Sequence, residues 1–187
     1  MVFSVRVFLD TSALIPLSGL RGVSIAEVFV KTCQKAGIVL CVSHIQVDEK
    51  VPREMFSYEE RIDRAVKILS DMGLKVSLEA TPIAVYDTSR YDMSKYGGDV
   101  ENALYEKLLK LISECDRAMG KNGDATRDAV IGVSALDHDL FIVCDECLYR
   151  GFQLATADWG ALRKRLPKTI LTKPTPEGVA KSILDSS

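Results

Sequence analysis

The chain has 187 residues and a net charge of −2 at neutral pH, with 47% hydrophobic and 27% charged residues. These proportions are those of an ordinary globular protein, and the length fits one domain with a sizeable core. The near-neutral charge excludes a general attraction to nucleic acid or to an anionic membrane, although a cluster of acidic metal ligands lowers the net charge of a nucleic-acid enzyme without repelling its substrate.

The first half of the chain alternates predicted strands with predicted helices. An apolar run at 5–9 predicts a buried strand, and Ser24 and Glu27 have the spacing of a capping box that opens a helix ending at Gly37. The elements expected next are a strand at 38–43, a helix at 57–73 opened by a second capping box, a strand at 74–78 and a long loop at 81–98.

The second half continues the alternation. Asp99 is expected to cap a helix that reaches Met119, and Asp124 is expected to open another one. A strand at 140–144 follows, the segment 147–166 fits a helix or a partly extended stretch, and a strand at 170–172 precedes a helix that starts at Thr175. Strands that alternate with helices predict an α/β fold with a parallel sheet flanked by helices.

The cysteines and the hydropathy indicate a compartment. The cysteines are odd in number and three of them lie in apolar patterns, which favours reduced thiols; they are Cys33, Cys41, Cys115, Cys144 and Cys147. No apolar stretch approaches the roughly 20 residues that span a bilayer, and the N-terminal run is too short for a signal peptide. We therefore expect a cytoplasmic protein that is not associated with a membrane.

Four acidic positions lie where the predicted fold would bring ligands together. Asp10 ends the first predicted strand, and Glu49 follows the second. Asp128 lies in the first turn of a predicted helix, and Asp145 and Glu146 end a later strand. If the first and the later strand are neighbours, these acids converge on the crevice where a doubly wound sheet binds its ligands.

Three or four carboxylates in one pocket cannot all stay ionised without a cation between them. Because the donors are oxygen atoms without a histidine cluster, they favour Mg²⁺ or Mn²⁺. A pair of such ions about 4 Å apart can activate a water molecule and hold the phosphate of an in-line displacement. The pattern of acids therefore indicates metal-assisted hydrolysis of a phosphodiester.

The ordered set of acids resembles the PIN-domain nucleases. The matching segments are 9–15, 43–49, 128–136 and 142–146, in that order along the chain. The resemblance implies a three-layer α/β/α, Rossmann-like domain with a central parallel sheet of four to five strands. It also implies divalent-metal endoribonuclease activity, either as the toxin of a toxin–antitoxin pair or in RNA processing.

Carried over residue by residue, the resemblance assigns a role to each acid. Asp10, Glu49 and Asp128 match the first three acids of the family, and Ser12 matches the hydroxyl that supports the metal. The fourth acid is Asp145 by residue type or Glu146 by spacing, with a slight preference for Asp145. The implied catalytic residues are Asp10, Glu49, Asp128 and Asp145, and the implied metal ligands are Asp10, Asp128, Asp145 and Glu146.

The resemblance also bears on organisation and partners. The whole chain, 1–187, reads as one PIN-like domain in which 50–123 is a helical and loop elaboration, so that the insertion between the second and third acidic motifs is longer than in compact toxins. RNA is the implied substrate. A small antitoxin is the partner expected of a toxin, and a homodimer is compatible with the sequence.

Several residues have two interpretations. Asp124 reads first as a helix cap and second as an auxiliary metal contact, while Asp158 reads as a surface acid. The basic residues Arg163, Lys164 and Arg165 are the first candidates for phosphate contact. His44 and His138 stand alone in the sequence, and the CxxC pattern of Cys144 and Cys147 also occurs in redox enzymes and zinc sites.

Two other classes of function remain open at this stage. A phosphohydrolase or a receiver domain would use Asp10 as a nucleophile, but Ser12 stands where a phosphohydrolase needs a second acid. A non-catalytic PIN-like module would bind RNA or a partner protein through the same scaffold, and the full set of acids argues against it.

Overall fold

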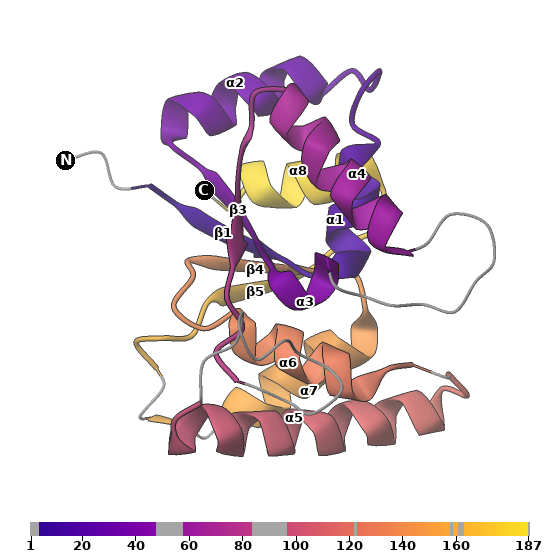
Figure 1. Ribbon diagram of the computed structural model, residues 1–187, viewed down its shortest axis with the longest axis vertical. Helices are drawn as coiled ribbons and strands as arrows, with labels where there is room; N and C mark the ends of the chain where they lie inside the picture. Colours follow the sequence, from indigo (N-terminus) through magenta and orange to yellow (C-terminus); the bar gives the residue numbers. More distant parts are fainter. Residues whose placement is uncertain are drawn as a thin grey trace.

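The computed structural model describes residues 4–47, 58–83, 97–121, 123–157, 159–160 and 163–186. At its centre lies a five-stranded sheet in the order β3-β2-β1-β4-β5, in which every neighbouring pair is parallel (Figure 1). The strands are β1 (Arg6–Leu9), β2 (Val39–Ser43), β3 (Lys75–Glu79), β4 (Leu140–Val143) and β5 (Lys168–Leu171). The prediction of an α/β fold with a parallel sheet is confirmed.

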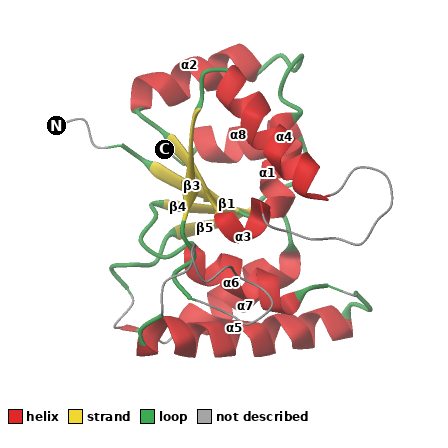
Figure 2. Cartoon of the chain, viewed as in Figure 1, coloured by secondary structure: helices red, strands yellow, loops and turns green. Residues whose placement is uncertain are grey.

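Helices cover both faces of the sheet, which gives three layers (Figure 2). One face carries α1 (Thr11–Ser18), α2 (Ala26–Ala36), α4 (Tyr58–Asp71) and α8 (Pro176–Leu184). The other carries α5 (Asp99–Ala118), α6 (Ala125–Ser134) and α7 (Glu146–Thr156), and the short α3 (His44–Val47) follows β2 directly. In the part of the chain that the structure describes, none of these helices is long and apolar enough to cross a membrane.

Alternate residues of each strand feed two separate cores. Val7 and Leu9 of β1 belong to the core beneath α1, α2, α4 and α8, whereas Phe8 belongs to the core beneath α5, α6 and α7. All three side chains are completely buried. Burial on both faces explains why the central strands read as continuous apolar runs rather than as alternating ones.

The strand order places a topological switch point between β1 and β4. The chain builds β2 and β3 on one side of β1 and then crosses to build β4 and β5 on the other. In open α/β sheets of this kind, ligands bind beyond the carboxyl ends of the strands at the switch point. Asp10 directly follows β1, and Asp145 follows β4 after one intervening residue.

The structure changes two expected helix starts and adds one helix that was not expected. Ser24 does not cap α2, because a turn precedes that helix and the Ala26 amide donates to the Val23 carbonyl instead. Asp99 is the first residue of α5, and Gly98 holds the cap position. No sequence pattern indicated α1, a helix of only eight residues with Pro16 inside it. The caps at Asp124 and Thr175 are confirmed.

The ambiguous segment 147–166 begins as a helix, α7, which ends at Thr156. Gly151 lowered the helical signal, but its lack of a side chain has a packing reason. A Cβ at this position would lie 2.9 Å from the side chain of Ile112 on α5. Glycine therefore allows α5 and α7 to approach closely, and the segment 50–123 contributes α4, β3 and α5 to the layers.

The expectation that all five cysteines are reduced is wrong for one pair. Cys115 near the end of α5 and Cys147 near the start of α7 form a disulfide across 32 residues of chain. Neither the spacing nor the apolar pattern indicates this pair, because the packing of α5 on α7 brings the two cysteines together. Cys33, Cys41 and Cys144 are free thiols.

Reduction of the disulfide is expected to lower the free energy of unfolding by about 2–4 kcal/mol, because the bond restricts the unfolded chain. Urea denaturation with and without a reductant measures the difference. The variant with Cys115→Ser and Cys147→Ser is the control and should not respond to the reductant. An unchanged urea midpoint for the reduced wild-type protein would contradict this expectation.

Candidate functional site

Asp10 lies in a buried position where the central strand ends. It caps α1, and its Oδ1 accepts a hydrogen bond of 2.7 Å from the Ala13 amide. Only 2% of the residue is exposed. Burial raises the pKa of Asp10 from 3.8 to about 7, although the hydrogen bonds from Ser12 and from the Ala13 amide lower it. Asp10 therefore exchanges its proton near neutral pH.

Ser12 connects Asp10 to the neighbouring strand. Its hydroxyl donates to Oδ2 of Asp10 over 2.6 Å and accepts from the amide of Cys144 over 3.1 Å. Because Cys144 directly follows β4, this bridge joins the carboxyl ends of β1 and β4. The structure thus gives Ser12 a positioning role beside Asp10, at the place where the sequence predicted a supporting hydroxyl.

Gln46 is a positioning residue that the sequence did not reveal. The side chain is completely buried, and its Nε2 donates to the Leu9 carbonyl and to Oγ1 of Thr11, at 3.0 and 3.2 Å. Its Oε1 accepts from the Ser43 amide at 2.7 Å. Gln46 therefore fixes both residues that flank Asp10 and ties them to the end of β2.

Asp128 faces the same region from the first turn of α6. Burial raises its pKa from 3.8 to about 8, and repulsion from Asp145 and then Asp10 contributes further. The carboxylates of Asp10 and Asp145 also repel each other. The structure therefore brings together three of the acids that the sequence singled out.

Asp145 and Glu146 have different surroundings in the structure. Asp145 caps α7 and accepts from the amides of Cys147 and Leu148, while Lys121 donates to its Oδ2 over 3.0 Å. These contacts outweigh burial and hold the pKa of Asp145 below its ordinary value. Glu146 instead pairs with Arg150 on the same helix and is 41% exposed. Asp145 is the acid that belongs to the group.

Asp116 on α5 is a fourth acid of this group, and the sequence analysis missed it. The residue is buried, and its Oδ2 has no hydrogen-bond partner among the described residues. Burial and the charge of Asp145 raise its pKa, and Lys121 opposes the shift. One sequence feature could have identified Asp116. It is the next position in a series of buried residues spaced four apart, Leu104, Leu108 and Ile112.

The structure describes some, but not all, of the other residues that the sequence singled out. Glu49 and Asp158 lie outside the described residues. Asp124 caps α6 by accepting from the Arg127 amide, which confirms the preferred interpretation. Arg165 pairs with Asp137 and Glu101, and Arg163 and Lys164 are exposed. These three basic residues precede β5, so they lie at the amino edge of the sheet, opposite Asp10 and Asp145.

The switch-point group, Asp10, Asp116, Asp128 and Asp145, offers only oxygen donors. Among the described residues, no three of these carboxylates have oxygen atoms within 4.8 Å of one another. One ion therefore cannot contact three of them directly in this arrangement, because donors about 2.1 Å from a Mg²⁺ ion lie at most about 4.2 Å apart.

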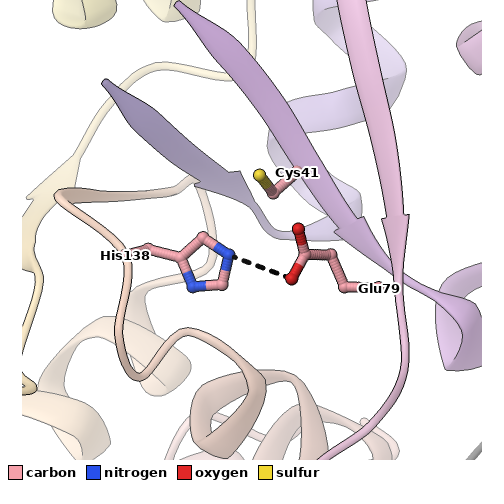
Figure 3. Close-up of side chains that lie close together, drawn as sticks. All are labelled: Cys41, Glu79 and His138. Carbon is pink, nitrogen blue, oxygen red and sulfur yellow. Dashed lines mark ion pairs between the residues drawn. The ribbon is translucent and has the colours of Figure 1, made fainter. Parts of the chain in front are cut away.

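A second group of side chains lies closer together. It consists of Cys41, Glu79 and His138, whose potential ligand atoms lie within 4.8 Å of one another and could hold a metal ion (Figure 3). Nε2 of His138 lies 3.7 Å from Oε2 of Glu79. Burial, and then the charge of Arg6, lower the pKa of His138, so the imidazole is neutral at neutral pH. No sequence pattern indicates a partner for His138, because the three residues come from distant segments of the chain.

Comparisons with known proteins identify no relative of this chain: no family model, no curated protein and no solved structure matches it. The functional argument therefore depends on the residues and on their arrangement.

The folded pKa values of Asp10 and Asp128 lie above the unfolded value, so the folded protein holds protons that the unfolded chain releases above about pH 4. The free energy of unfolding consequently falls as the pH rises from about 4 to about 8. Asp128→Asn keeps the shape of the side chain but removes its charge. Its stability relative to the wild type should therefore increase with pH across this range and then level off.

Urea midpoints measured between pH 5 and pH 8.5 test this expectation. Asp124→Asn on the same helix is the matched control, because asparagine is an equally good cap, and its pH dependence should follow that of the wild type. A constant difference between Asp128→Asn and the wild type at all pH values would show that Asp128 does not titrate as described.

Proposed function

We propose that this protein is a divalent-metal-dependent endoribonuclease that hydrolyses RNA phosphodiesters. The observation that supports the proposal is the switch-point group, in which Asp10, Asp128 and Asp145 repel one another at the carboxyl ends of the two central strands. Mutual repulsion costs folding energy, and a cation bound among the carboxylates relieves it. A cost of this kind at a ligand-binding position is typical of a functional site.

The donor set fits Mg²⁺ or Mn²⁺. Asp10, Asp128 and Asp145 would hold the ion, in part through its water ligands, and the buried Oδ2 of Asp116 has capacity for a metal-bound water. When bound, the metal supplies an activated water and stabilises the charge that develops on the phosphate. Glu49, the remaining acid of the PIN resemblance, is part of the proposal on sequence grounds alone.

Residues of the chain set the charge and fix the orientation of the carboxylates in the proposed metal site. Asp10 gives up its proton near pH 7 and Asp128 near pH 8, so a bound cation would displace the protons that remain on them at neutral pH. Ser12 and the Ala13 amide fix the two oxygens of Asp10. Lys121 holds Oδ2 of Asp145, while the α7 amides hold its Oδ1. Fixed donors lose little conformational freedom when they bind a ligand.

RNA is the proposed substrate class by resemblance to the PIN-domain nucleases, as toxin or as RNA-processing enzyme. The alternatives are a phosphotransfer protein and a non-catalytic binding module. The strand order disfavours a receiver domain, which has the order 2-1-3-4-5 instead of 3-2-1-4-5. A phosphohydrolase would need a second acid at the position of Ser12. Ser12 instead donates a hydrogen bond to Asp10, which disfavours this alternative.

Replacement of Asp10 by Asn tests the proposal. We expect RNA cleavage in Mn²⁺ to fall by at least about 100-fold, since removal even of an outer partner of a metal ligand costs about 10–100-fold. The melting temperature should stay near or above that of the wild type, because the substitution removes a buried charge and keeps an oxygen that caps α1. The measurements are cleavage of a labelled RNA, Mn²⁺ titration calorimetry and thermal unfolding.

Asp124→Asn is again the control and should retain both cleavage and Mn²⁺ binding. Undiminished cleavage by a purified Asp10→Asn protein would contradict the nuclease proposal. Absence of Mn²⁺ binding by the wild type would favour the non-catalytic module, and a phosphoaspartate trapped at Asp10 would favour the phosphohydrolase.

A further inference from the structure

The group of Cys41, Glu79 and His138 lies apart from the switch-point carboxylates. Cys41 comes from the middle of β2, Glu79 ends the edge strand β3, and His138 lies in the connection from α6 to β4. Cys41 and His138 are buried beneath the α5–α7 layer, and the His138 ring packs on Phe8. Arg6, which pairs with Glu79, precedes Asp10 by four strand residues, about 13 Å.

The hydrogen bonds of His138 define which nitrogen is available. Nδ1 lies 2.9 Å from the Leu136 carbonyl and 3.2 Å from that of Ala135, so Nδ1 carries the proton and donates. Nε2 consequently presents a lone pair. It is buried without a hydrogen-bond partner in the described part of the chain and points toward Glu79 (Figure 3). This is the arrangement of metal-binding histidines, whose other nitrogen donates to a carbonyl or a carboxylate.

Glu79 is arranged in a corresponding way. Arg6 donates to its Oε1, while Oε2 faces Nε2 of His138 at 3.7 Å. Two lone pairs therefore face each other at a distance too long for a hydrogen bond. Donors about 2.0–2.2 Å from a zinc ion lie about 3.4 Å apart in a tetrahedral site and at most about 4.3 Å apart. The observed separation falls between these values.

Cys41 determines the kind of ion. A thiolate together with an imidazole and a carboxylate favours a softer ion than the oxygen-only group does, and zinc accepts all three donor types. The thiolate and the Glu79 carboxylate balance the two charges of Zn²⁺. Arg6 adds a positive charge that also acts on His138, and solvent screens this charge in part because the Arg6 side chain is 38% exposed.

We propose that Cys41, Glu79 and His138 form a Zn²⁺ site in which Arg6 and the Leu136 carbonyl hold the ligands in place. The ion binds Sγ of Cys41, Oε2 of Glu79 and Nε2 of His138, and the cysteine releases its proton to solvent as the ion binds. The site joins β2, the edge strand β3 and the segment before β4. Its direct effect is therefore to stabilise the fold on the α5–α7 side of the sheet.

Titration of the metal-free, full-length protein with Co²⁺ tests this site, because a cobalt–thiolate bond gives a charge-transfer absorption band. We expect the band to saturate at one equivalent for the wild type and to be lost in Cys41→Ser. Cys144→Ser, at another free thiol, is the matched control and should keep the band, as should Asp128→Asn in the switch-point group. The band should disappear when Zn²⁺ is added in excess.

Thermal unfolding with and without Zn²⁺ provides a second readout that does not depend on cobalt. Zn²⁺ should raise the melting temperature of the wild type and of Cys144→Ser but not that of Cys41→Ser or His138→Gln. Far-ultraviolet circular dichroism in a chelator shows whether each variant is folded. Absence of the band in the wild type, or a band of equal strength in folded Cys41→Ser, would overturn the proposal.

Discussion

The burial of a carboxylate at the end of the central strand is the constraint on which the rest of this structure depends. β1 has a neighbour on each side and a helical layer on each face, so Asp10 emerges from the most enclosed part of the fold. Its amide donates to the Ile142 carbonyl of β4, while Gln46 fixes the residues on either side of it. The junction of three strands thus holds one acid in place, and its raised pKa is the electrostatic consequence.

The two sides of the sheet present groups of different chemical hardness. At the carboxyl edge, the switch-point group gathers carboxylates from the strand ends and from α5 and α6. On the α5–α7 face, Cys41 and His138 combine sulfur and nitrogen donors with a carboxylate that Arg6 already holds. Because magnesium prefers oxygen donors and zinc accepts sulfur and nitrogen, the two proposed sites would select different ions from the same solution. The two groups share no residue, although Cys41 pairs in register with Phe8, two residues before Asp10.

Sequence patterns predicted the structural features that depend only on short segments of the chain. The five strands, the caps at Asp124 and Thr175, and the placement of Asp10 and Asp145 after neighbouring strands all follow from local periodicity and topology rules. Asp116 shows where this reasoning ends. Apolar residues such as Leu111 and Cys115 continue the helical pattern in the sequence, whereas the buried positions of the helix run from Leu108 through Ile112 to Asp116.

Local sequence patterns could not predict contacts between residues that are distant in the sequence. The disulfide of Cys115 and Cys147 requires α5 to lie on α7, and the group around His138 requires β2, β3 and the start of β4 to meet. These contacts are set by tertiary packing, and no local spacing encodes them.

Lys121 shows how the switch-point group remains folded with so much negative charge. Its ammonium group lies 3.0 Å from Asp145 and also interacts with Asp116 and Glu146. One cation cannot balance four buried or half-buried carboxylates, so Asp145 takes the charge and Asp10 and Asp128 keep protons up to about pH 7 and 8. Because those protons must leave before the oxygens become anionic ligands, the proposed metal binding at this group would depend on pH. The folded chain therefore stores protons at the positions where a divalent cation would replace them.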